Sequence, residues 1–514
     1  MDGNFTGPTP KWRDSIFSSG WHKHGTPIDV VSPGSGQAID RIGSATAHTV
    51  AEAAAKAAHA QPGWAAMSYD DRAGLFRKAA ALLEERTQDY AGIIMQESGS
   101  GFGKAMFEIS VAIRLLYEAS AMPSQSPGMV LPSTPGRISI CRRQPLGVVG
   151  VISPFNFPFY LSLRAVAPAL AIGNSVILKP DPRTSISGGM LIASLFDDAG
   201  LPPDVLHVLP GAGDVGEALC TDPHVAMIQF TGSTRTGRLI GKLAGEHLKK
   251  VSLELGGKNS LIVLDDADLD LAAANAAWGA YLHQGQICMT AGRILVQSSI
   301  IEPFTEKLAV KARNLGAAEG DHAFGPLINQ HQLAHADDIV RRTVDAGAKL
   351  LVGGGTNGLV YPPTVLTGVT PDMPAFKEEI FGPVAVLTPF SDDAEAIKLA
   401  NDTEYGLSAG IISRSVGRAM ALGEKLRVGL LHINDQTVAD EVLNPFGGRG
   451  KSGNGTSIGG PANWDEFSQW QWVTIQDTGC LTGCGPRRAI PAATRLYAST
   501  WPPRHFERAR CSCR

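Results

Sequence analysis

Hydrophobic and polar positions follow two different patterns along the chain. Between Thr49 and Glu97, apolar residues recur three and four positions apart, as in AGLFRKAAALLEER, which places them on one face of a helix. After Pro145, short apolar runs alternate with longer segments of helix length. Four of these runs are VVGVIS (148–153), SVILK (175–179), VLHVL (205–209) and MIQFT (227–231). The alternation predicts β-strand and crossover-helix units that build a parallel, doubly wound α/β sheet.

Ligands of such sheets bind outside the carboxyl ends of the strands. The loops that follow the four predicted strands are PFNFP, KPDPRT, PGAGDVG and TGSTRTG. We therefore expect functional residues in these loops.

A second alternating region begins at NSLIVL (259–264) and continues to about Ile433, with turns at GGGTNG and FGP. It predicts a second α/β domain. Two further segments, RISICRRQ (137–144) and WQWVTIQ (470–476), look like strands without adjoining crossover helices. They are typical of a protruding sheet, which could serve subunit contact.

The length and composition of the chain limit the possible domain organisation and class of protein. A chain of 514 residues exceeds the roughly 250 to 300 residues at which one hydrophobic core stops growing, so two or more packed units are expected. With 44% hydrophobic residues, 18% charged residues and a net charge of -4, the composition favours a soluble globular protein with no nucleic-acid partner. No apolar run reaches the ~18 residues of a membrane span, and MDGNFTGPTPKW does not resemble a secretion signal. We expect a cytoplasmic protein without a membrane partner.

The seven cysteines are unevenly distributed. Those of the main body are well separated, which fits a reducing compartment. The others crowd the last stretch, 479–514, which holds seven arginines, one glutamate and no lysine after Cys484. Its C-x3-C and C-x-C pairs lack zinc-site spacing. We expect no metal site, and interpret 479–514 as a disordered or mistranslated tail.

Two glycine-bounded loops could contact a nucleotide. GAGDVG (211–216) matches G-x-G-x-x-G, but the acidic residue that usually ends the next strand is missing, because MIQFT ends in Phe230 and Thr231. The glycines could simply make a tight turn. In TGSTRTG (231–237), free backbone N–H groups at a helix start favour an anion, although Ser-Thr is also an ordinary N-cap.

Three residues could carry chemistry. Cys288 in HQGQICMTAGR is either a nucleophile, stabilised as a thiolate at a loop or helix entrance, or inert packing. Glu254 stands in the apolar run VSLELGG, where burial would raise its pKa towards that of a general base; the alternative is an edge-strand glutamate facing water. Asn156 in PFNFP could donate to an oxyanion or form an Asx-turn.

The segments PFNFP, KP, FTGS, LELGGKN, GQIC and EEIFGPV occur in this order, and the chain thereby resembles the aldehyde dehydrogenase superfamily over residues 15 to 478. Through GVVGVISPFNFP, AVAPALAIGN, LHQGQ and HIND it is most similar to bacterial benzaldehyde dehydrogenases. The resemblance implies a Rossmann-type NAD(P)-binding domain (1–123 and 146–257), a catalytic domain (258–450), and oligomerisation strands (124–145 and 460–478). A homodimer or homotetramer is then expected.

The resemblance also implies roles. Cys288 would attack the aldehyde, Asn156 and the Cys288 backbone N–H would hold the oxyanion, and Glu254 would activate water against the thioester. Lys179 and Glu379 would bind ribose hydroxyls, Phe381 would pack by the nicotinamide, and Ser233 would meet the pyrophosphate. The full set of expected cofactor contacts is Ser153, Pro154, Phe155, Lys179, Pro182, Gly211, Gly232, Ser233, Leu255, Glu379 and Phe381.

The identity of the dinucleotide depends on one departure from the family pattern. Many NAD-preferring members carry a glutamate three residues after the lysine, where this chain has Pro182 followed by Arg183. Arg183 could attract a 2′-phosphate. The benzaldehyde dehydrogenases use NAD+, so we expect NAD, with NADP as the alternative.

The expected aldehyde pocket is largely apolar and suits a small aromatic aldehyde. Its residues are Phe157, Leu161, Arg164, Leu282, Ile287, Met289 and Phe446. Arg164 leaves a second interpretation open, a semialdehyde dehydrogenase in which it binds a substrate carboxylate, unless it faces away and pairs structurally. A non-catalytic protein that retains the fold is the alternative from another class.

Overall fold

The computed structural model describes residues 10–318 and 324–476. The chain divides into two compact units, the larger bounded by Met1–Pro127 and Arg143–Trp470 and the smaller by Gly128–Arg142 and Gln471–Arg514. The predicted tail at 479–514 lies outside the described residues, as do its cysteines.

The first sheet of the larger unit has seven strands in the order β11-β10-β7-β8-β9-β1-β2. Their bounds are β1 Ser15–Phe17, β2 Trp21–Lys23, β7 Val148–Ile152, β8 Ser175–Lys179, β9 Leu206–Val208, β10 Val225–Thr231 and β11 Lys250–Glu254. The strands from β11 to β9 are parallel. The α/β fold predicted from the sequence is confirmed, and the four predicted runs are β7 to β10.

The antiparallel strands near the start were not predicted. β1 pairs with β9 and β2, and β3 (Ile28–Val31) pairs with β4 (Ala38–Ile42) in a separate two-stranded sheet. These strands are three to five residues long, too short for their alternation to stand out.

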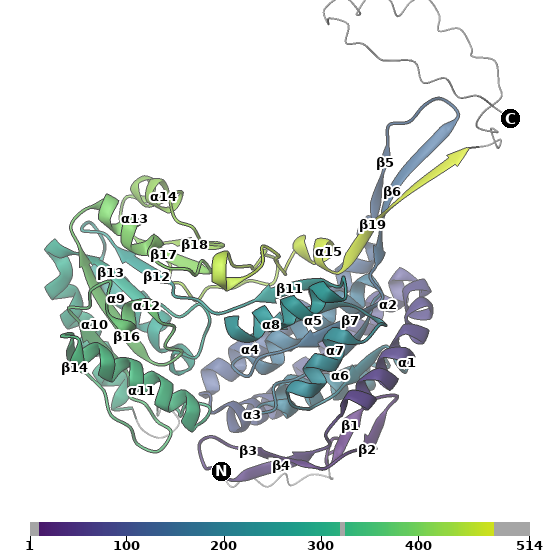
Figure 1. Ribbon diagram of the computed structural model, residues 1–514, viewed down its shortest axis with the longest axis horizontal. Coiled ribbons are helices and arrows are strands. Elements are labelled where there is room, and N and C mark those ends of the chain that lie inside the picture. Colours follow the sequence, from purple (N-terminus) through teal and green to yellow (C-terminus); the bar gives the residue numbers. More distant parts are fainter. Residues whose placement is uncertain (1–9, 319–323, 477–514) are drawn as a thin grey trace, which may run out of the picture. The chain divides into compact units, whose positions relative to one another are not determined.

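Helices cover both faces of the first sheet (Figure 1). Their bounds are α1 Ala47–Ala66, α2 Tyr69–Glu85, α3 Thr87–Ser98, α4 Phe102–Ala121, α5 Pro158–Ile172, α6 Leu191–Ala199, α7 Gly213–Thr221 and α8 Thr234–Glu246. Because side chains alternate along a strand, Val149 and Val151 of β7 pack in one core with α5 and α6. Val148 and Ile152 pack in another core with α1 and α7. Both faces of β7 are thus buried, as expected for a parallel sheet.

The second sheet has the order β14-β15-β16-β13-β12-β17-β18. Its strands are β12 Ser260–Val263, β13 Arg293–Gln297, β14 Lys349–Val352, β15 Thr364–Thr367, β16 Val384–Phe390, β17 Ser408–Ile412 and β18 Leu430–Ile433. Its helices are α9 Leu269–Tyr281, α10 Ile301–Gly316, α11 Gln330–Asp345, α12 Pro374–Lys377, α13 Asp393–Asn401 and α14 Val416–Gly423. The strands of the first sheet lie in the ranges predicted for the cofactor-binding domain, and those of the second sheet lie in the range predicted for the catalytic domain. The assignment of these two functions to the two sheets stays a prediction.

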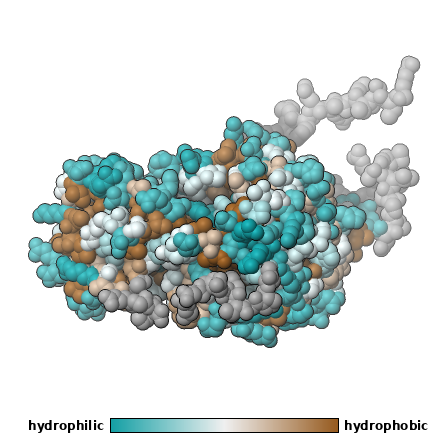
Figure 2. All heavy atoms as spheres, turned by 90° about the horizontal axis from the view of Figure 1, so that it is seen from below, coloured by the Kyte–Doolittle hydropathy of each residue, from teal (hydrophilic) through white to brown (hydrophobic). Residues whose placement is uncertain are grey.

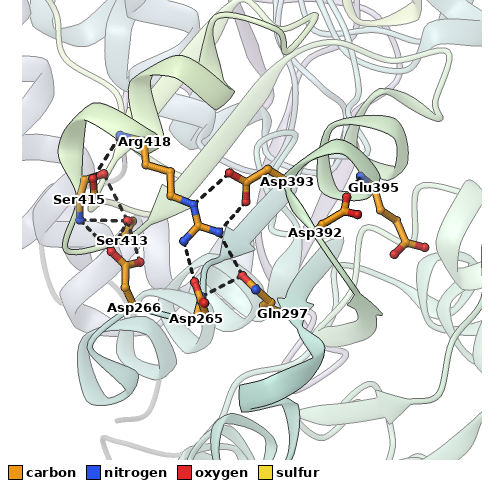
Figure 3. A network of polar contacts seen from close by, with 9 residues as sticks. All are labelled: Asp265, Asp266, Gln297, Asp392, Asp393, Glu395, Ser413, Ser415 and Arg418. Atoms are coloured by element: carbon orange, nitrogen blue, oxygen red, sulfur yellow. Dashed lines mark hydrogen bonds and ion pairs between the residues drawn. The ribbon is translucent and has the colours of Figure 1, made fainter.

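A polar network ties together the ends of several elements of the second sheet (Figure 3). Arg418 of α14 donates to Asp265, which follows β12, over 2.6 Å, and to Asp393 of α13 over 2.6 and 3.0 Å. Asp266 accepts from Ser413 and from the Ser415 backbone N–H. The network fixes α13 and α14 on the sheet at a place that carries none of the predicted site residues.

The smaller unit contains most of an antiparallel sheet in the order β19-β6-β5. Its strands are β5 Gly128–Leu131, β6 Arg137–Pro145 and β19 Ser468–Gln476, and α15 (Ala462–Glu466) precedes β19. The segments 137–144 and 470–476 are therefore neighbouring strands of one sheet, as expected. Several large apolar side chains of this unit are exposed, namely Met129, Val130, Ile138, Trp472 and Ile475.

Within residues 10–318 and 324–476, no helix is both long and apolar enough to span a bilayer, and no group of three or more His, Cys, Asp or Glu side chains could hold a metal ion. On the face drawn in Figure 2, hydrophobic residues form separate patches among hydrophilic ones. Such a mixture is ordinary for the surface of a folded protein.

Candidate active site

The three predicted chemical residues come from segments far apart in the sequence. Asn156 follows β7, Glu254 is the last residue of β11, and Cys288 lies between α9 and β13. Asn156 and Cys288 line one cavity, and the carboxylate of Glu254 is close enough to raise the pKa of the Cys288 thiol. The fold thus brings together the residues that the sequence singled out.

The backbone before Cys288 is strained. His283 and Gln284 have φ values of +47° and +54°, a left-handed region that non-glycine residues rarely adopt and that is often kept at functional sites. Gly285 follows with φ +67°, and a Cβ there would lie 2.2 Å from the Gly382 carbonyl oxygen. Only glycine fits this position, so the turn that presents Cys288 depends on it.

The Cys288 thiol is not activated by its surroundings. Burial, followed by the nearby Glu379, Glu254 and Asp440 carboxylates, raises its pKa well above the ordinary value, and the Met289 backbone N–H lowers it less. The expected stabilisation of a thiolate at a helix entrance is absent among the described residues around Cys288, because carboxylates stand where cations would be needed. Thiolate formation therefore requires a proton acceptor.

Glu254 is a buried carboxylate near this thiol. It belongs to the edge strand β11 but is only 3% exposed, so the alternative of an edge glutamate facing water is wrong. Among the described residues, neither of its carboxylate oxygens has a hydrogen-bond partner. Burial raises its pKa well above 4.5, opposed by the charge of Arg164 and assisted by those of Asp440 and Glu466. Both the orphaned oxygens and the raised pKa suit a general base.

Asn156 is held in the cavity wall by the Cys288 loop. Its Nδ2 donates to the Gln286 carbonyl over 2.9 Å, which uses one of its two amide hydrogens and leaves the other for a ligand. Asn259 fixes the same loop, because its Nδ2 donates to the carbonyls of Cys288 and Thr290 over 2.8 and 2.9 Å. The amide and the thiol are thereby positioned by one backbone segment.

The cavity has a volume of about 600 Å³, within the usual range for small-molecule sites. Six of the seven predicted pocket residues line it, namely Phe157, Leu161, Leu282, Ile287, Met289 and Phe446. They form one apolar cluster with Cys288. A flat apolar molecule fits such a lining.

The seventh, Arg164, differs from the expectation. It is 2% exposed and is not among the described residues that line the cavity. Its guanidinium forms an ion pair with Asp440 and donates to the Tyr160 hydroxyl over 2.6 Å. A cation on a helix that is buried on all sides needs an internal counter-ion, and the aspartate that supplies it lies 276 residues further along the chain.

Sequence reasoning also missed several lining residues. Trp278 lies in the last turn of α9, four positions before the predicted Leu282, which follows the helix. Phe107 belongs to α4, and His432, Asp435 and Asp440 belong to β18 and the segment after it. His432 and Asp435 belong to the HIND motif of the family resemblance, which gave no role to either, and Asp440 carries no local signal.

Nine of the eleven predicted cofactor residues lie at the carboxyl ends of the parallel strands of the first sheet, and Glu379 and Phe381 precede β16. Lys179 ends β8 and is 6% exposed, and burial lowers its pKa while Asp181 and Asp214 raise it. Ser153 follows β7, and its buried hydroxyl has no partner among the described residues. Gly216 lies beside Lys179, 3.7 Å from its Cδ if a Cβ is added.

Both glycine-bounded loops have a structural role. A Cβ at Gly211 would lie 2.4 Å from Val215, so this glycine allows the tight turn into α7. Ser233 is the N-cap of α8, where its Oγ accepts from the Thr236 N–H over 3.3 Å. It is nevertheless exposed, as is Pro182, whereas Leu255 is buried and donates its N–H to the Ser452 carbonyl over 2.9 Å.

The predicted nicotinamide side contains two aromatic rings in contact. Phe155 and Phe381 have centroids 5.8 Å apart in an edge-to-face arrangement, and Phe381 has φ +52°. Glu379 accepts from the Gly257 N–H over 2.9 Å, and burial raises its pKa to about 7, opposed by this hydrogen bond and by Lys258. A Cβ at Gly256 would lie 2.2 Å from the Glu379 carboxylate, so glycine is needed for this approach.

Arg183, considered above as a site for a 2′-phosphate, is already paired. Its guanidinium binds both carboxylate oxygens of Asp181 and lies 4.1 Å from the centre of the Phe155 ring. The positive charge is thus neutralised in place.

Comparisons with known proteins agree with this arrangement. Residues 21–473 match the model of the aldehyde dehydrogenase family. The chain is 49% identical to vanillin dehydrogenase of Amycolatopsis sp., covering 91% of this chain and 97% of the relative. It is 46% identical to benzaldehyde dehydrogenase [NAD(+)] of Pseudomonas putida, with the same coverage.

The chain belongs to the aldehyde dehydrogenase family. Its fold is also that of a solved NAD-dependent aldehyde dehydrogenase from Sinorhizobium meliloti, with a TM-score of 0.88, 35% identity, and coverage of 95% of this chain and 99% of the other.

In this aldehyde dehydrogenase a buried ion pair supports the loop that carries Asn156. Lys104 and Glu108 of α4 are bonded over 2.5 Å, with side chains 3% and 0% exposed. Glu108 also accepts from the N–H groups of Phe159 and Tyr160 over 2.8 and 3.0 Å, at the start of α5, which follows Asn156 directly. Lys104 lies 4.4 Å from the centre of the Phe157 ring.

The carboxyl ends of the strands of the first sheet suit a dinucleotide. The orphaned Ser153 hydroxyl, the buried Lys179 and the open space at Gly213, where an added Cβ would contact nothing within 4 Å, leave donors and room beside the helix starts of α7 and α8. Backbone N–H groups at helix starts favour phosphates. The described residues therefore fit the cofactor that the family requires.

Proposed function

We propose that this aldehyde dehydrogenase oxidises a neutral aromatic aldehyde to its carboxylic acid, with NAD+ as the hydride acceptor and water as the source of the second oxygen. The observation that carries the proposal is the cavity of about 600 Å³, in which Cys288 and Asn156 adjoin the aromatic side chains of Phe157, Trp278 and Phe446. The relatives named for vanillin and benzaldehyde support the substrate class.

The residues divide the reaction into two stages. The Cys288 sulfur adds to the aldehyde carbon, the thiol proton passes to a base, and the Asn156 amide stabilises the negative oxygen with the Cys288 N–H. When bound, NAD+ supplies the acceptor for the hydride that leaves this carbon. Glu254 then takes a proton from water, which attacks the thioester, breaks the carbon–sulfur bond and releases the acid.

The cofactor residues serve placement. Lys179 and Glu379 would hold ribose hydroxyls, Ser233 and Gly232 would meet the pyrophosphate at the start of α8, and Phe381 would flank the nicotinamide. The Asp181–Arg183 ion pair favours NAD+ over NADP+, because its carboxylate repels a 2′-phosphate.

The semialdehyde alternative is less well supported. It needs Arg164 as an unpaired cation at the substrate, whereas Arg164 is buried and bonded to Asp440. The non-catalytic alternative is opposed by the joint placement of Cys288 and Asn156 on one cavity, with Glu254 as an unpaired carboxylate near the thiol.

Assembly and location stay predictions. The exposed apolar side chains of β5, β6 and β19 favour pairing of this sheet with a second copy in a homodimer or homotetramer. A cytoplasmic location is expected from the sequence.

The test is the absorbance of reduced nicotinamide with purified protein, benzaldehyde or vanillin, and NAD+ or NADP+ in parallel. We expect fast reduction of NAD+ with both aromatic aldehydes and slow reduction with a short aliphatic aldehyde. Absence of reduction with every aldehyde would overturn the proposal.

Two variants test which residue acts in each stage of the reaction. Cys288→Ala should abolish oxidation while dinucleotide binding, followed by fluorescence, remains. Glu254→Gln should give a burst of about one NADH per site followed by slow turnover, because hydrolysis becomes limiting. A Glu254→Gln enzyme without a burst would contradict this division of roles.

A further inference from the structure

The buried ion pair at the cavity wall combines a residue that faces the ligand with one that does not. Asp440 lines the cavity and its side chain is 12% exposed, whereas Arg164 lies behind it with its side chain 2% exposed. A ligand in the cavity therefore meets the carboxylate before it meets the guanidinium.

The bonding around this pair leaves the guanidinium little freedom. Nη1 of Arg164 donates to Asp440 and to the Tyr160 hydroxyl, and that hydroxyl donates to Asp440 over 3.0 Å. Nη2 donates to the Ile458 carbonyl over 3.3 Å. The face of the guanidinium is covered by the Phe446 ring, whose centre is 4.9 Å away. Arg164 is thus fixed on Asp440 and cannot turn towards a substrate without breaking these bonds.

The charge of the remaining cavity wall has the same sign as Asp440. Asp435 and Glu441 also line the cavity, and no lysine or arginine is among the described residues of its lining. Glu441 is offset by Arg114, over 3.0 Å, at an exposed position. A ligand carboxylate would therefore lose its hydration and meet like charge without a free cation in compensation.

We propose that Asp440 is a specificity-determining residue: by occupying Arg164 and facing the cavity, it excludes aldehydes that carry an ionised carboxylate and reserves the site for neutral ones. The inference rests on the aldehyde oxidation proposed above. Asp440 thus acts as a repulsive group against charged aldehydes. The protein contains an arginine that could bind their carboxylate, but Asp440 occupies it.

Three aromatic aldehydes isolate this effect. Benzaldehyde, 4-carboxybenzaldehyde and its neutral methyl ester share one ring, and the last two have similar bulk. For the natural sequence we expect kcat/KM for the ester to exceed that for the acid by about 30-fold or more, roughly the ratio expected from 2 kcal/mol of discrimination. Succinic semialdehyde serves as an aliphatic acid of the same charge.

Asp440→Asn keeps the side-chain volume and one acceptor for Tyr160 while removing the charge. It should lower the ester-to-acid ratio at least tenfold, mainly through KM for the acid, and raise the rate with succinic semialdehyde. An unchanged ratio in the folded variant would overturn the inference. Asp465→Asn, which alters an ion pair with Arg143 away from the cavity lining, is the matched control and should leave the ratio within twofold.

A second variant covers the case in which Asp440→Asn does not fold, because it leaves Arg164 without a counter-ion. The double variant Arg164→Met with Asp440→Leu removes both charges. Apolar side chains of similar size suit these buried positions, so we expect this variant to fold. It should lower the ester-to-acid ratio about threefold, less than Asp440→Asn, because repulsion is lost but no cation is freed. A ratio equal to that of the natural sequence would contradict the proposal.

A binding measurement separates this inference from the proposed function. By calorimetry, the neutral benzamide should bind to the natural sequence more tightly than 4-carbamoylbenzoate, which differs by one ionised carboxylate, and Asp440→Asn should reduce the difference at least tenfold. If no aldehyde is oxidised but this shift appears, aldehyde oxidation fails and the role of Asp440 in the cavity stands. If benzaldehyde is oxidised and neither ratio shifts, the role of Asp440 is wrong.

Discussion

Arg183 and Asp181 form a bidentate ion pair, in which Nε and Nη2 of the arginine donate to the two carboxylate oxygens over 2.8 and 2.7 Å. The pair follows β8 by two residues, beside Lys179, and Arg183 also covers the face of Phe155. An arginine that could bind a phosphate is therefore neutralised by its neighbour.

Asp181→Asn should shift the cofactor preference towards NADP+. Removing the carboxylate frees the guanidinium and ends its repulsion of a 2′-phosphate, so the ratio of kcat/KM for NADP+ to that for NAD+ should rise about tenfold. Steady-state kinetics with both dinucleotides measure it, and Arg183→Gln is the control that should lower the same ratio. If the NADP+-to-NAD+ ratio of kcat/KM changed in neither variant, the Asp181–Arg183 ion pair would not be in contact with the cofactor.

Glu254→Gln should stabilise the fold at neutral and alkaline pH. The pKa of Glu254 is raised above 4.5 by burial, so its contribution to stability is complete below about pH 4.5 and is lost as the pH rises through the folded-state pKa. Since the Glu254 carboxylate has no hydrogen-bond partner within residues 10–318 and 324–476, the amide should raise the free energy of unfolding by about 1–3 kcal/mol at pH 8. Urea unfolding at pH 8 and pH 5 tests this, because the gain should shrink at pH 5.

Cys288 should react slowly with iodoacetamide in the absence of cofactor. Burial and three carboxylates raise the pKa of its thiol, which keeps the thiolate fraction low at pH 7. Peptide mass spectrometry resolves Cys288 from the other cysteines and should show alkylation at least tenfold slower than that of a free thiol.

The same alkylation experiment tests whether the charge of Glu379 contributes to the slow reaction of Cys288. Glu379 has a pKa raised to about 7, so it is ionised at pH 8 and mostly protonated at pH 6. Glu379→Gln should therefore speed the alkylation of Cys288 severalfold at pH 8 and have little effect at pH 6. Equal acceleration at both values would mean a steric rather than an electrostatic cause.

Lys104→Met should destabilise the protein strongly. It leaves Glu108 as an unpaired charge in the interior, which costs about 3–5 kcal/mol. The double variant Lys104→Met with Glu108→Gln should recover most of this loss, because the amide oxygen still accepts from the N–H groups of Phe159 and Tyr160. Chemical unfolding of both variants measures the difference, and a double variant no more stable than the single one would contradict the argument.

The parallel core of the fold could be predicted because its signal is local. The buried strands of the first sheet are continuous apolar runs, and the helix length between them requires crossovers, so β7 to β10 were found within a few residues. β1 and β2 escaped because they are three residues long and belong to the sheet only by pairing with β9, far away in sequence.

The candidate site shows the same limit at the level of side chains. Cys288, Glu254 and Asn156 could be selected from short motifs, and six pocket residues from the family resemblance. The surroundings of Arg164 and Arg183 could not, because whether an arginine is free to bind a ligand depends on the carboxylates that it contacts. The partner of Arg183 is two residues away but is recognisable only from the turn geometry, and the partner of Arg164 lies on another segment.

Gly285 and Gly382 touch at a distance that excludes even a methyl group. Gly285 belongs to the turn that presents Cys288, and Gly382 directly follows Phe381, the ring expected beside the nicotinamide. The turn before Cys288 and the segment after Phe381 are thus in close backbone contact at these two glycines. The two segments can approach this closely only because Gly285 has no side chain, so the spacing between the Cys288 turn and the Phe381 segment depends on that glycine.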